Sequence, residues 1–280
     1  MFWNSLNYFA LDQKGTQYVR VLEDLVTSFV GIPLCPQKDI VVVAGGSRGI
    51  GSHLVTMFDS LGYKTILIDK RYPLNLIEPH RVSFYKCDIS DFEYTRLILD
   101  DISVRFGQIT VFINAVSLKS FTDAEVGKGV SLRKLMRTVY AGSMHIIQHI
   151  LPKMIAYDRG YIIDIASTEG LYTTENKSSY GAIQATKFQL LQLIEQTLKE
   201  QYKKNFLISN GRVRCLLLIF GKALNSKPHQ DMTTAKTVFS AIFHNRQGVQ
   251  GYSMRTNFKL ALRELDWQWY QMFKYLSPFL

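Results

Sequence analysis

Cysteine and proline are scarce in this 280-residue chain, which has three cysteines and seven prolines. Cys35, Cys87 and Cys215 are scattered and lack metal-ligand spacing, which excludes a disulfide scaffold and is typical of a reducing compartment. With only 18 glycines, the composition also excludes collagen and low-complexity disorder. The best candidate for an apolar span, residues 25–36, has 12 residues and two prolines, fewer than the roughly 18 needed to cross a bilayer.

Acidic residues are scarce in the second part of the chain. Residues 1–176 hold 18 basic and 18 acidic side chains, whereas residues 177–280 hold 15 and 5, so the whole net charge of +10 lies there. A basic half suggests nucleic acid or an anionic membrane surface as a partner. No base-reading motif accompanies it, which makes nucleic acid an unlikely partner. Because the N-terminus shows no signal peptide, we expect an intracellular protein, cytoplasmic or peripheral on the cytosolic face of a membrane.

Short apolar runs alternate with longer amphipathic segments from residue 39 onward. Runs such as Ile-Val-Val-Val-Ala suit parallel strands that are covered on both faces. We therefore predict a single α/β domain over residues 39–256, a doubly wound, mostly parallel Rossmann-like sheet with helices on both faces. A partly helical extension (1–38) would precede it. The predicted strands are Asp39–Ala44, Lys64–Asp69, Arg81–Cys87, Ile109–Asn114, Gly160–Ala166 and Val213–Ile219, and the predicted helices are Gly49–Leu61, Phe92–Phe106, Leu132–Tyr157 and Ser178–Tyr202.

A glycine-rich turn joins the first predicted strand to the first predicted helix. Gly45 permits a tight turn, Gly49 allows the backbone to approach a pyrophosphate, and Gly51 allows close helix packing. The N–H groups at the helix N-terminus attract phosphate. Asp69 follows Gly45 by 24 residues, where a carboxylate accepts hydrogen bonds from the adenosine ribose. The pattern predicts a dinucleotide site made of Gly45, Ser47, Arg48, Gly49, Ile50, Gly51 and Asp69.

The GxxxGxG spacing of this turn resembles the short-chain dehydrogenase/reductase family, and further motifs follow in that family's order over about residues 39–221. The resemblance implies that Asp88 and Ile89 contact the adenine ring and that Asn114, in a remnant of the NNAG motif, belongs to the cofactor site. Gly160–Ser167 resembles the strand that ends in the active-site serine, and Tyr180 follows Ser167 by the family's 13 residues. Gly221 resembles the glycine of the family's PG motif.

The resemblance also implies a catalytic site made of Ser167, Tyr180 and Gln184, with two positions changed. In the family, the serine orients the substrate oxygen, the tyrosine exchanges a proton, and a lysine four residues later lowers the tyrosine pKa and holds the nicotinamide ribose. Here Gln184 stands at the lysine position and Val139 at that of a further asparagine. Gln184 can hydrogen-bond a ribose hydroxyl, but it brings no charge. We therefore expect weakened turnover.

Lys187 is the obvious candidate to replace the missing lysine. Seven helical residues return it to nearly the same face as Tyr180, but roughly 10 Å further along the helix axis. We therefore favour a solvent-facing Lys187 over an active-site role, and leave Lys177 in the preceding loop as an open alternative. Asp164 is interpreted as a strand residue with satisfied polar contacts, not as a catalytic acid.

The choice of cofactor depends on opposing charges. Asp69 favours NAD, because a carboxylate there repels the 2′-phosphate of NADP. Arg48, Lys70 and Arg71 could reach that phosphate, so NADP remains an alternative.

His145 and His149 have a spacing that could place both on one metal, but no third ligand is in view, and we predict no metal site.

The C-terminal residues 257–280 form an amphipathic pattern rich in tryptophan, tyrosine and phenylalanine. Such a helix could lie on an anionic membrane surface. Packing on the domain itself is the reading we favour, with a substrate-pocket cover or a subunit contact in a homo-oligomer as alternatives.

Two functions follow. The first is hydride transfer between NAD(P)(H) and a small hydrophobic alcohol or carbonyl, weakened by the loss of the active-site lysine and asparagine. The alternative is a dinucleotide-binding pseudoenzyme that acts as a sensor or a partner-binding protein, with a membrane surface as one option. The sequence does not identify the substrate.

Overall fold

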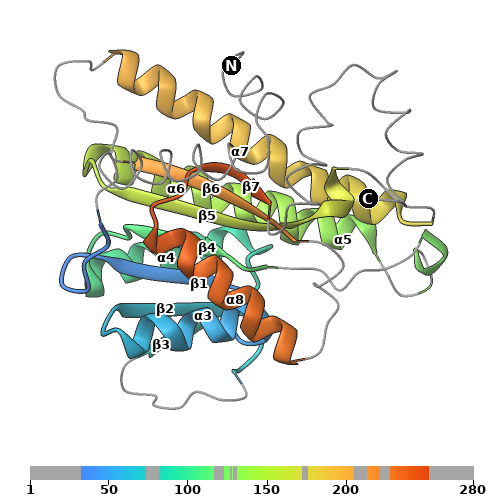
Figure 1. Cartoon of the computed structure of the whole chain (residues 1–280), viewed down its shortest axis with the longest axis horizontal. Helices are drawn as coiled ribbons and strands as arrows, with labels where there is room; N and C mark the ends of the chain where they lie inside the picture. The colour runs from blue at the N-terminus through green and yellow to red at the C-terminus, as the bar shows by residue number, and fades with distance from the viewer. Residues whose placement is uncertain are drawn as a thin grey trace, which may run out of the picture.

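The computed structural model describes residues 33–73, 82–116, 123–126, 128, 131–171, 176–204, 213–220 and 228–251. Within them, seven parallel strands form one sheet in the order β3-β2-β1-β4-β5-β6-β7 (Figure 1). The predicted parallel Rossmann-like sheet is therefore confirmed. The strands are β1 (Ile40–Ala44), β2 (Lys64–Asp69), β3 (Val82–Lys86), β4 (Val111–Asn114), β5 (Gly160–Ser167), β6 (Val213–Phe220) and β7 (Gly248–Gly251).

Helices cover both faces of the sheet, which explains why the central strands are apolar throughout. On β1, Val41 and Val43 pack in a cluster with residues of α3 and α8, while Val42 and Ala44 pack with residues of α4, α6 and α7. Figure 1 shows α3 and α8 together on one face. The long helices are α3 (Gly49–Ser60), α4 (Phe92–Phe106), α6 (Ser143–Ala156), α7 (Ser178–Lys204) and α8 (Pro228–Phe243). The short ones are η1 (Asp123–Glu125), α5 (Leu132–Met136) and η3 (Thr168–Gly170).

Three features differ from the sequence prediction. The single helix predicted for Leu132–Tyr157 is divided by a π-helical turn, η2 (Arg137–Gly142), between α5 and α6. Helix α8 and strand β7 were not predicted. Strand β7 gives little signal in the sequence, because it has only four residues and two of them are glycine. The predicted C-terminal helix and residues 1–32 of the predicted extension lie outside the described residues, so both remain predictions.

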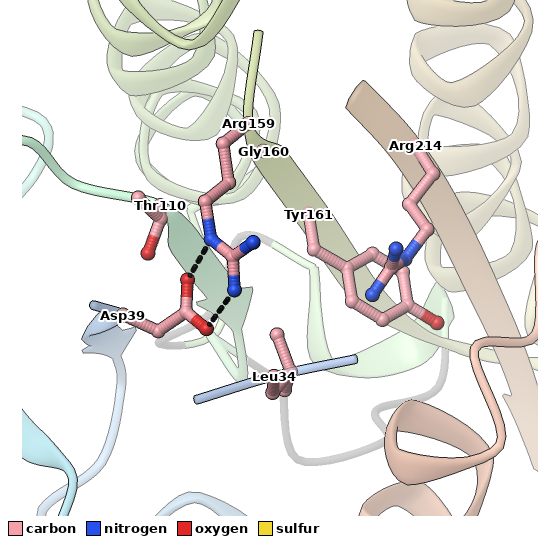
Figure 2. Close-up of a pocket in the computed structure, with 7 residues that line it drawn as sticks. All are labelled: Leu34, Asp39, Thr110, Arg159, Gly160, Tyr161 and Arg214. Carbon is pink, nitrogen blue, oxygen red and sulfur yellow. Dashed lines mark hydrogen bonds and ion pairs between the residues drawn. The ribbon is translucent and has the colours of Figure 1, made fainter. Parts of the chain in front are cut away.

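A buried ion pair joins the start of β1 to the start of β5, at the amino end of the sheet. Asp39 is 1% exposed, and its two carboxylate oxygens accept hydrogen bonds from Arg159 Nε at 2.7 Å and Nη2 at 2.6 Å. Figure 2 shows this pair at one side of a small cavity and Arg214 stacked on Tyr161 at the other. Arg159 also donates to the Pro33 carbonyl oxygen, which ties the chain before β1 to the sheet.

We predict that Arg159→Met lowers the free energy of unfolding by about 3–5 kcal/mol, because the substitution leaves the Asp39 carboxylate buried without its positively charged partner and with only the Cys35 N–H as a donor. Urea denaturation followed by circular dichroism measures the change. The control is Lys153→Met, which breaks the half-exposed Lys153–Asp100 pair and should cost less than about 1 kcal/mol. Equal losses in the two variants would contradict the structural importance assigned to the Asp39–Arg159 pair.

Candidate functional site

The glycine turn lies where the strand order reverses, between β2 and β4 on either side of β1. Ligands of doubly wound sheets bind in the crevice at such a point. A Cβ atom on Gly45, whose φ is +79°, would lie 2.8 Å from the backbone nitrogen of Val116, just after β4. A Cβ atom on Gly51 would lie 2.5 Å from the Gly45 carbonyl oxygen. Both positions therefore require glycine, and the start of α3 is held directly against the end of β4.

Asp69 lies beside this turn, as the sequence register predicts. One carboxylate oxygen accepts a hydrogen bond from the Ser47 backbone N–H at 3.1 Å, and the other accepts one from the Arg71 N–H at 3.0 Å. The Ser47 hydroxyl donates to the Arg71 carbonyl oxygen at 2.6 Å. These contacts fix a carboxylate at the end of β2, next to the glycine turn. The side chains of Arg48, Lys70 and Arg71 are exposed around it.

Asp231 brings a second carboxylate to the same turn from the first turns of α8. Its Oδ2 lies 3.5 Å from the position that a Cβ on Gly49 would take. Burial raises the pKa of Asp231, and the positive charge of His53 on α3 opposes that shift. Sequence analysis missed this residue, because the spacing of α8 from the glycine turn along the chain gives no indication of their proximity.

The other predicted cofactor residues lie on neighbouring strand ends. The Asp88 carboxylate accepts hydrogen bonds from the backbone and hydroxyl of Ser90 and closes the turn after β3. Ile89 packs against Gly142, where a Cβ would lie 2.7 Å from the Ile89 carbonyl oxygen. The fully buried Asn114 donates to the Ser143 hydroxyl at 2.9 Å and accepts from the Val116 N–H at 3.3 Å. Asn114 thus braces the end of β4 against α6.

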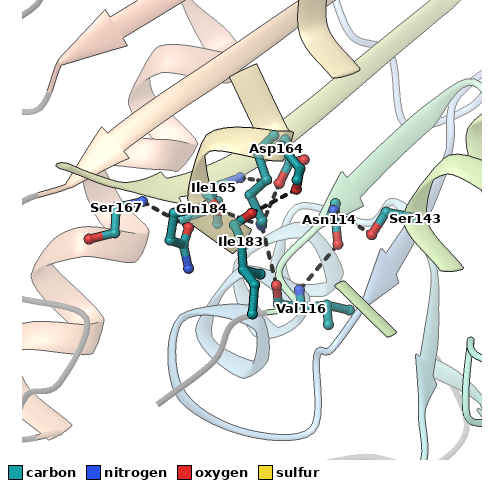
Figure 3. Close-up of polar contacts among 10 residues, drawn as sticks. Asn114, Val116, Ser143, Asp164, Ile165, Ser167, Ile183 and Gln184 are labelled. Atoms are coloured by element: carbon teal, nitrogen blue, oxygen red, sulfur yellow. Dashed lines mark hydrogen bonds and ion pairs between the residues drawn. The ribbon is translucent and has the colours of Figure 1, made fainter. Parts of the chain in front are cut away.

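Ser167, Tyr180 and Gln184 are brought together at the end of β5 and the start of α7. Figure 3 shows Ser167 beside Gln184. The Ser167 backbone N–H donates to Gln184 Oε1 at 3.2 Å, and the Ser167 hydroxyl accepts from the Glu169 N–H at 3.3 Å. Tyr180 is only 1% exposed. Burial raises its pKa and the negative charge of Glu169 adds to this, while hydrogen bonds with the Ser167 and Gln184 side chains oppose it.

Apolar side chains surround the tyrosine. Val139 and Ile183 form a buried cluster with Tyr180, and partly buried aliphatic side chains pack against it: Val116, Val126, Leu132 and Leu135. Val139, at the position of the family's asparagine, is therefore part of an apolar wall. Lys177, the open alternative, lies 3.7 Å from the carboxylate of the buried Glu169, an acidic residue that sequence reasoning left unassigned.

Lys187 does not face solvent, so that sequence prediction is wrong. Its side chain is 2% exposed, and its Nζ donates to Asp164 Oδ1 at 2.8 Å. The same Nζ donates to the carbonyl oxygens of Ile165 at 2.6 Å and Val116 at 3.3 Å. The reading of Asp164 as fully satisfied is only half right, since its Oδ2 has no hydrogen-bond partner in the described part of the chain.

The two candidate metal ligands on α6 have other roles. His149 contacts Asp100 of α4 at 2.8 Å and Lys153 at 2.9 Å, whereas the His145 ring stacks on Phe92. Among the described residues, no group of three or more histidine, cysteine or acidic residues could hold a metal ion.

The described helices also include none whose length and apolar content would allow it to span a bilayer.

Comparisons with known proteins agree on one family. The family model described as short chain dehydrogenase matches residues 39–214. The chain is 30% identical to Dehydrogenase RED2 of Cochliobolus heterostrophus over 149 residues, which cover 53% of this chain and 56% of that protein. It therefore spans about half the length of this relative. An uncharacterized oxidoreductase of Saccharomyces cerevisiae is 21% identical over 273 residues, 91% of this chain and 89% of the relative.

Solved structures share the fold. A short-chain dehydrogenase from Streptomyces avermitilis has a TM-score of 0.63 at 18% identity, with 81% of this chain and 92% of the other covered. The structure of ElxO with NADP bound has a TM-score of 0.60 at 20% identity and covers 76% of this chain and 96% of its own.

We predict that Gln184→Lys lowers the pKa of Tyr180 by about 1–3 units, because an ammonium group close to the phenol favours tyrosinate. Ultraviolet difference titration measures this pKa, with Tyr180→Phe versions of each protein subtracted to remove the other tyrosines. The matched control is Gln192→Lys, the same substitution at an exposed position of α7, which should leave Tyr180 unchanged. An unchanged pKa in Gln184→Lys would show that position 184 does not act on Tyr180.

Proposed function

Because the chain belongs to the short-chain dehydrogenase family, we propose that it is an NAD(P)-dependent oxidoreductase acting on a small hydrophobic carbonyl or alcohol. One observation carries the proposal: the glycine turn with Asp69 and the Ser167–Tyr180–Gln184 cluster both lie at the carboxyl ends of the neighbouring strands β2, β1, β4 and β5. A dinucleotide bound across the glycine turn would extend its nicotinamide toward Tyr180.

The residues of the turn fit a dinucleotide. Within the described residues, only the Asp231 carboxylate lies near the space that a Cβ on Gly49 would occupy, so no backbone or apolar side chain there blocks a phosphate sterically, although the carboxylate would repel its charge. Ser47, Arg48 and Ile50 line the start of α3, whose first N–H groups have no partner within the helix and would donate to a phosphate bound there. Asp69 would accept hydrogen bonds from the adenosine ribose, with Asp88 and Ile89 beside the adenine and Asn114 bracing the crevice.

We favour NAD over NADP. The Asp69 carboxylate is fixed by two backbone N–H groups at the place where the 2′-phosphate of NADP would lie, and the like charges repel. Arg48 and Arg71 are exposed and free to approach the same phosphate, which is the observation in favour of NADP. The relative ElxO binds NADP.

Ser167 and Tyr180 would carry the proton chemistry. When bound, reduced nicotinamide supplies a hydride to the carbonyl carbon. The Ser167 hydroxyl would orient the carbonyl oxygen, and the Tyr180 hydroxyl would give its proton to that oxygen and become tyrosinate until solvent reprotonates it. Because the pKa of Tyr180 is raised and Gln184 brings no positive charge, the tyrosine stays protonated near neutral pH. It is therefore a usable acid but a poor base.

This proton balance favours carbonyl reduction over alcohol oxidation. Reduction needs the protonated tyrosine, which predominates, whereas oxidation needs tyrosinate, which the site disfavours. The aliphatic wall formed by Val139, Ile183 and their neighbours suits an apolar substrate better than a charged one.

A second candidate function is supported by the contacts of Gln184. Its Oε1 accepts a hydrogen bond from the Ser167 backbone N–H, so the Gln184 side chain holds the end of β5 against α7 whether or not a ligand is bound. With Val139 apolar and no lysine of the described residues acting on Tyr180, the site suits a dinucleotide-binding pseudoenzyme, a sensor or partner-binding protein. Tight NADH binding without turnover on a broad carbonyl panel would select this function.

We predict measurable carbonyl reduction with NADH near neutral pH that Tyr180→Phe lowers by a factor of about 100 or more. The pH profiles separate the two directions: reduction should fall, and alcohol oxidation should rise, as the pH passes the raised pKa of Tyr180. Consumption of NADH over a panel of aliphatic and aromatic ketones measures the rate. Reduction that persists in Tyr180→Phe would show that another residue supplies the proton.

We also predict that Asp231→Asn tightens NADH binding about tenfold near pH 7, because the carboxylate repels the pyrophosphate at the start of α3. The pKa of Asp231 is raised, so the wild-type carboxylate becomes neutral as the pH falls through that value, and binding should strengthen there. Asp231→Asn should lose this pH dependence. Fluorescence titration with NADH measures it, and His53→Gln separates any effect of histidine protonation. Equal affinities of wild type and Asp231→Asn would place the pyrophosphate away from this carboxylate.

A further inference from the structure

The ammonium group of Lys187 lies between α7 and the sheet, where it hydrogen-bonds three groups on two neighbouring segments. It reaches from α7 to the side chain of Asp164, to the carbonyl of Ile165 on β5 and to the carbonyl of Val116 just after β4. An ammonium has three N–H donors, and here all three have acceptors. Lys187 therefore has no donor left for a cofactor or a substrate, and it does not substitute directly for the lysine that Gln184 replaces.

The pair lies where two strands separate. The parallel pairing of β4 with β5 ends at Asn114 opposite Asp164. Past this point the chain after β4 runs toward the glycine turn, while β5 continues two residues beyond Ile165 to Ser167. Lys187 bridges these diverging segments, and the hydrogen bonds of Asn114 with Ser143 and Val116 support the β4 side (Figure 3).

Stability alone is a weak reason for this arrangement. The Lys187–Asp164 pair is almost fully buried and borders a small cavity whose other lining residues are aliphatic: Ile147, Ile162, Leu190, Leu191, Ile194 and Leu216. Asp164 Oδ2 has no hydrogen-bond partner in the described part of the chain, which adds a desolvation cost. Well-packed apolar residues are often at least as stabilising as such a buried pair. Apolar residues, however, have no N–H groups with which to join the two backbone carbonyls directly, as the Lys187 ammonium does.

We propose that Lys187, paired with Asp164, is a positioning residue that sets the distance between the cofactor-facing end of β4 and the Ser167 end of β5. This inference rests on the proposed function, because it assumes that the dinucleotide binds between the end of β4 and the end of β5. The pair holds the Asn114–Val116 segment and Ser167 in register with Tyr180 and Gln184, which lie on the same helix as Lys187.

The test compares the double variant Asp164→Leu/Lys187→Met with the wild-type full chain. Replacing both partners leaves no unpaired charge, so the double variant should stay folded and lose less stability than a variant that removes only one partner, although the Ile165 and Val116 carbonyls and the Ile165 N–H each lose a hydrogen-bond partner. We expect its NADH dissociation constant to rise about tenfold to a hundredfold, because the two walls of the crevice lose their fixed spacing. With turnover, kcat should fall as well, since Ser167 and Tyr180 lose their alignment.

The matched control is Arg159→Met, which breaks the Asp39 ion pair at the opposite end of β1 and β5. It should destabilise the protein and leave the NADH dissociation constant within about twofold of the wild type, since it does not touch the crevice. A double variant that binds NADH as the wild type does would overturn the positioning role and leave the pair purely structural. So would an equal loss of affinity in Arg159→Met.

A second measurement does not depend on cofactor. The pKa of Tyr180 depends on its hydrogen bonds with Ser167 and Gln184, so misalignment should shift its ultraviolet titration in the double variant and not in Arg159→Met. An unchanged titration overturns the inference even if the double variant loses affinity. A wild type that binds neither NADH nor NADPH contradicts the proposed function, and in that case the Tyr180 titration still decides the role of Lys187.

Discussion

The close contact between the glycine turn and the end of β4 is the constraint on which the rest of the site depends. Any side chain at Gly45 would collide with the backbone after β4, and any at Gly51 would collide with Gly45 itself. Because these side chains are missing, α3 begins against the sheet with its N-terminus open toward the crevice. The same contact brings Asp69 within reach of Ser47 and leaves Asn114 to support the adjoining wall.

Local patterns predicted the sheet well, because a strand buried on both faces has to be apolar along its length. The six predicted strands and the main helix boundaries agree with the structure within a few residues. The position of Asp69 beside the glycine turn was also predictable, since it depends only on two adjacent strands and a short stretch of backbone. Strand β7 was not, because four residues with two glycines carry no apolar periodicity.

Lys187 shows where sequence reasoning fails at the site. Helical spacing correctly placed Lys187 on nearly the same face of the helix as Tyr180. It could not show that β5 and the chain after β4 cover this face at Lys187, about two turns further along the helix. Lysine is seldom fully buried, so the sequence favoured solvent. The carboxylate that pairs with Lys187 belongs to Asp164, which lies 23 residues earlier in the chain on strand β5. Asp231 was missed for a related reason, since only the packing of α8 on α3 brings it near Gly49.

The π-helical turn before α6 has a consequence for how this site can change. A turn of this kind accommodates one more residue than the α-helix on either side of it, and Val139 lies within it. Deleting a single residue there would return the turn to α-helical winding and leave α5 and α6 in their present register, because the extra residue is absorbed locally. A different side chain would then take the place of Val139 beside Tyr180. The lining of the apolar wall is thus set by the number of residues in this turn as much as by their identity.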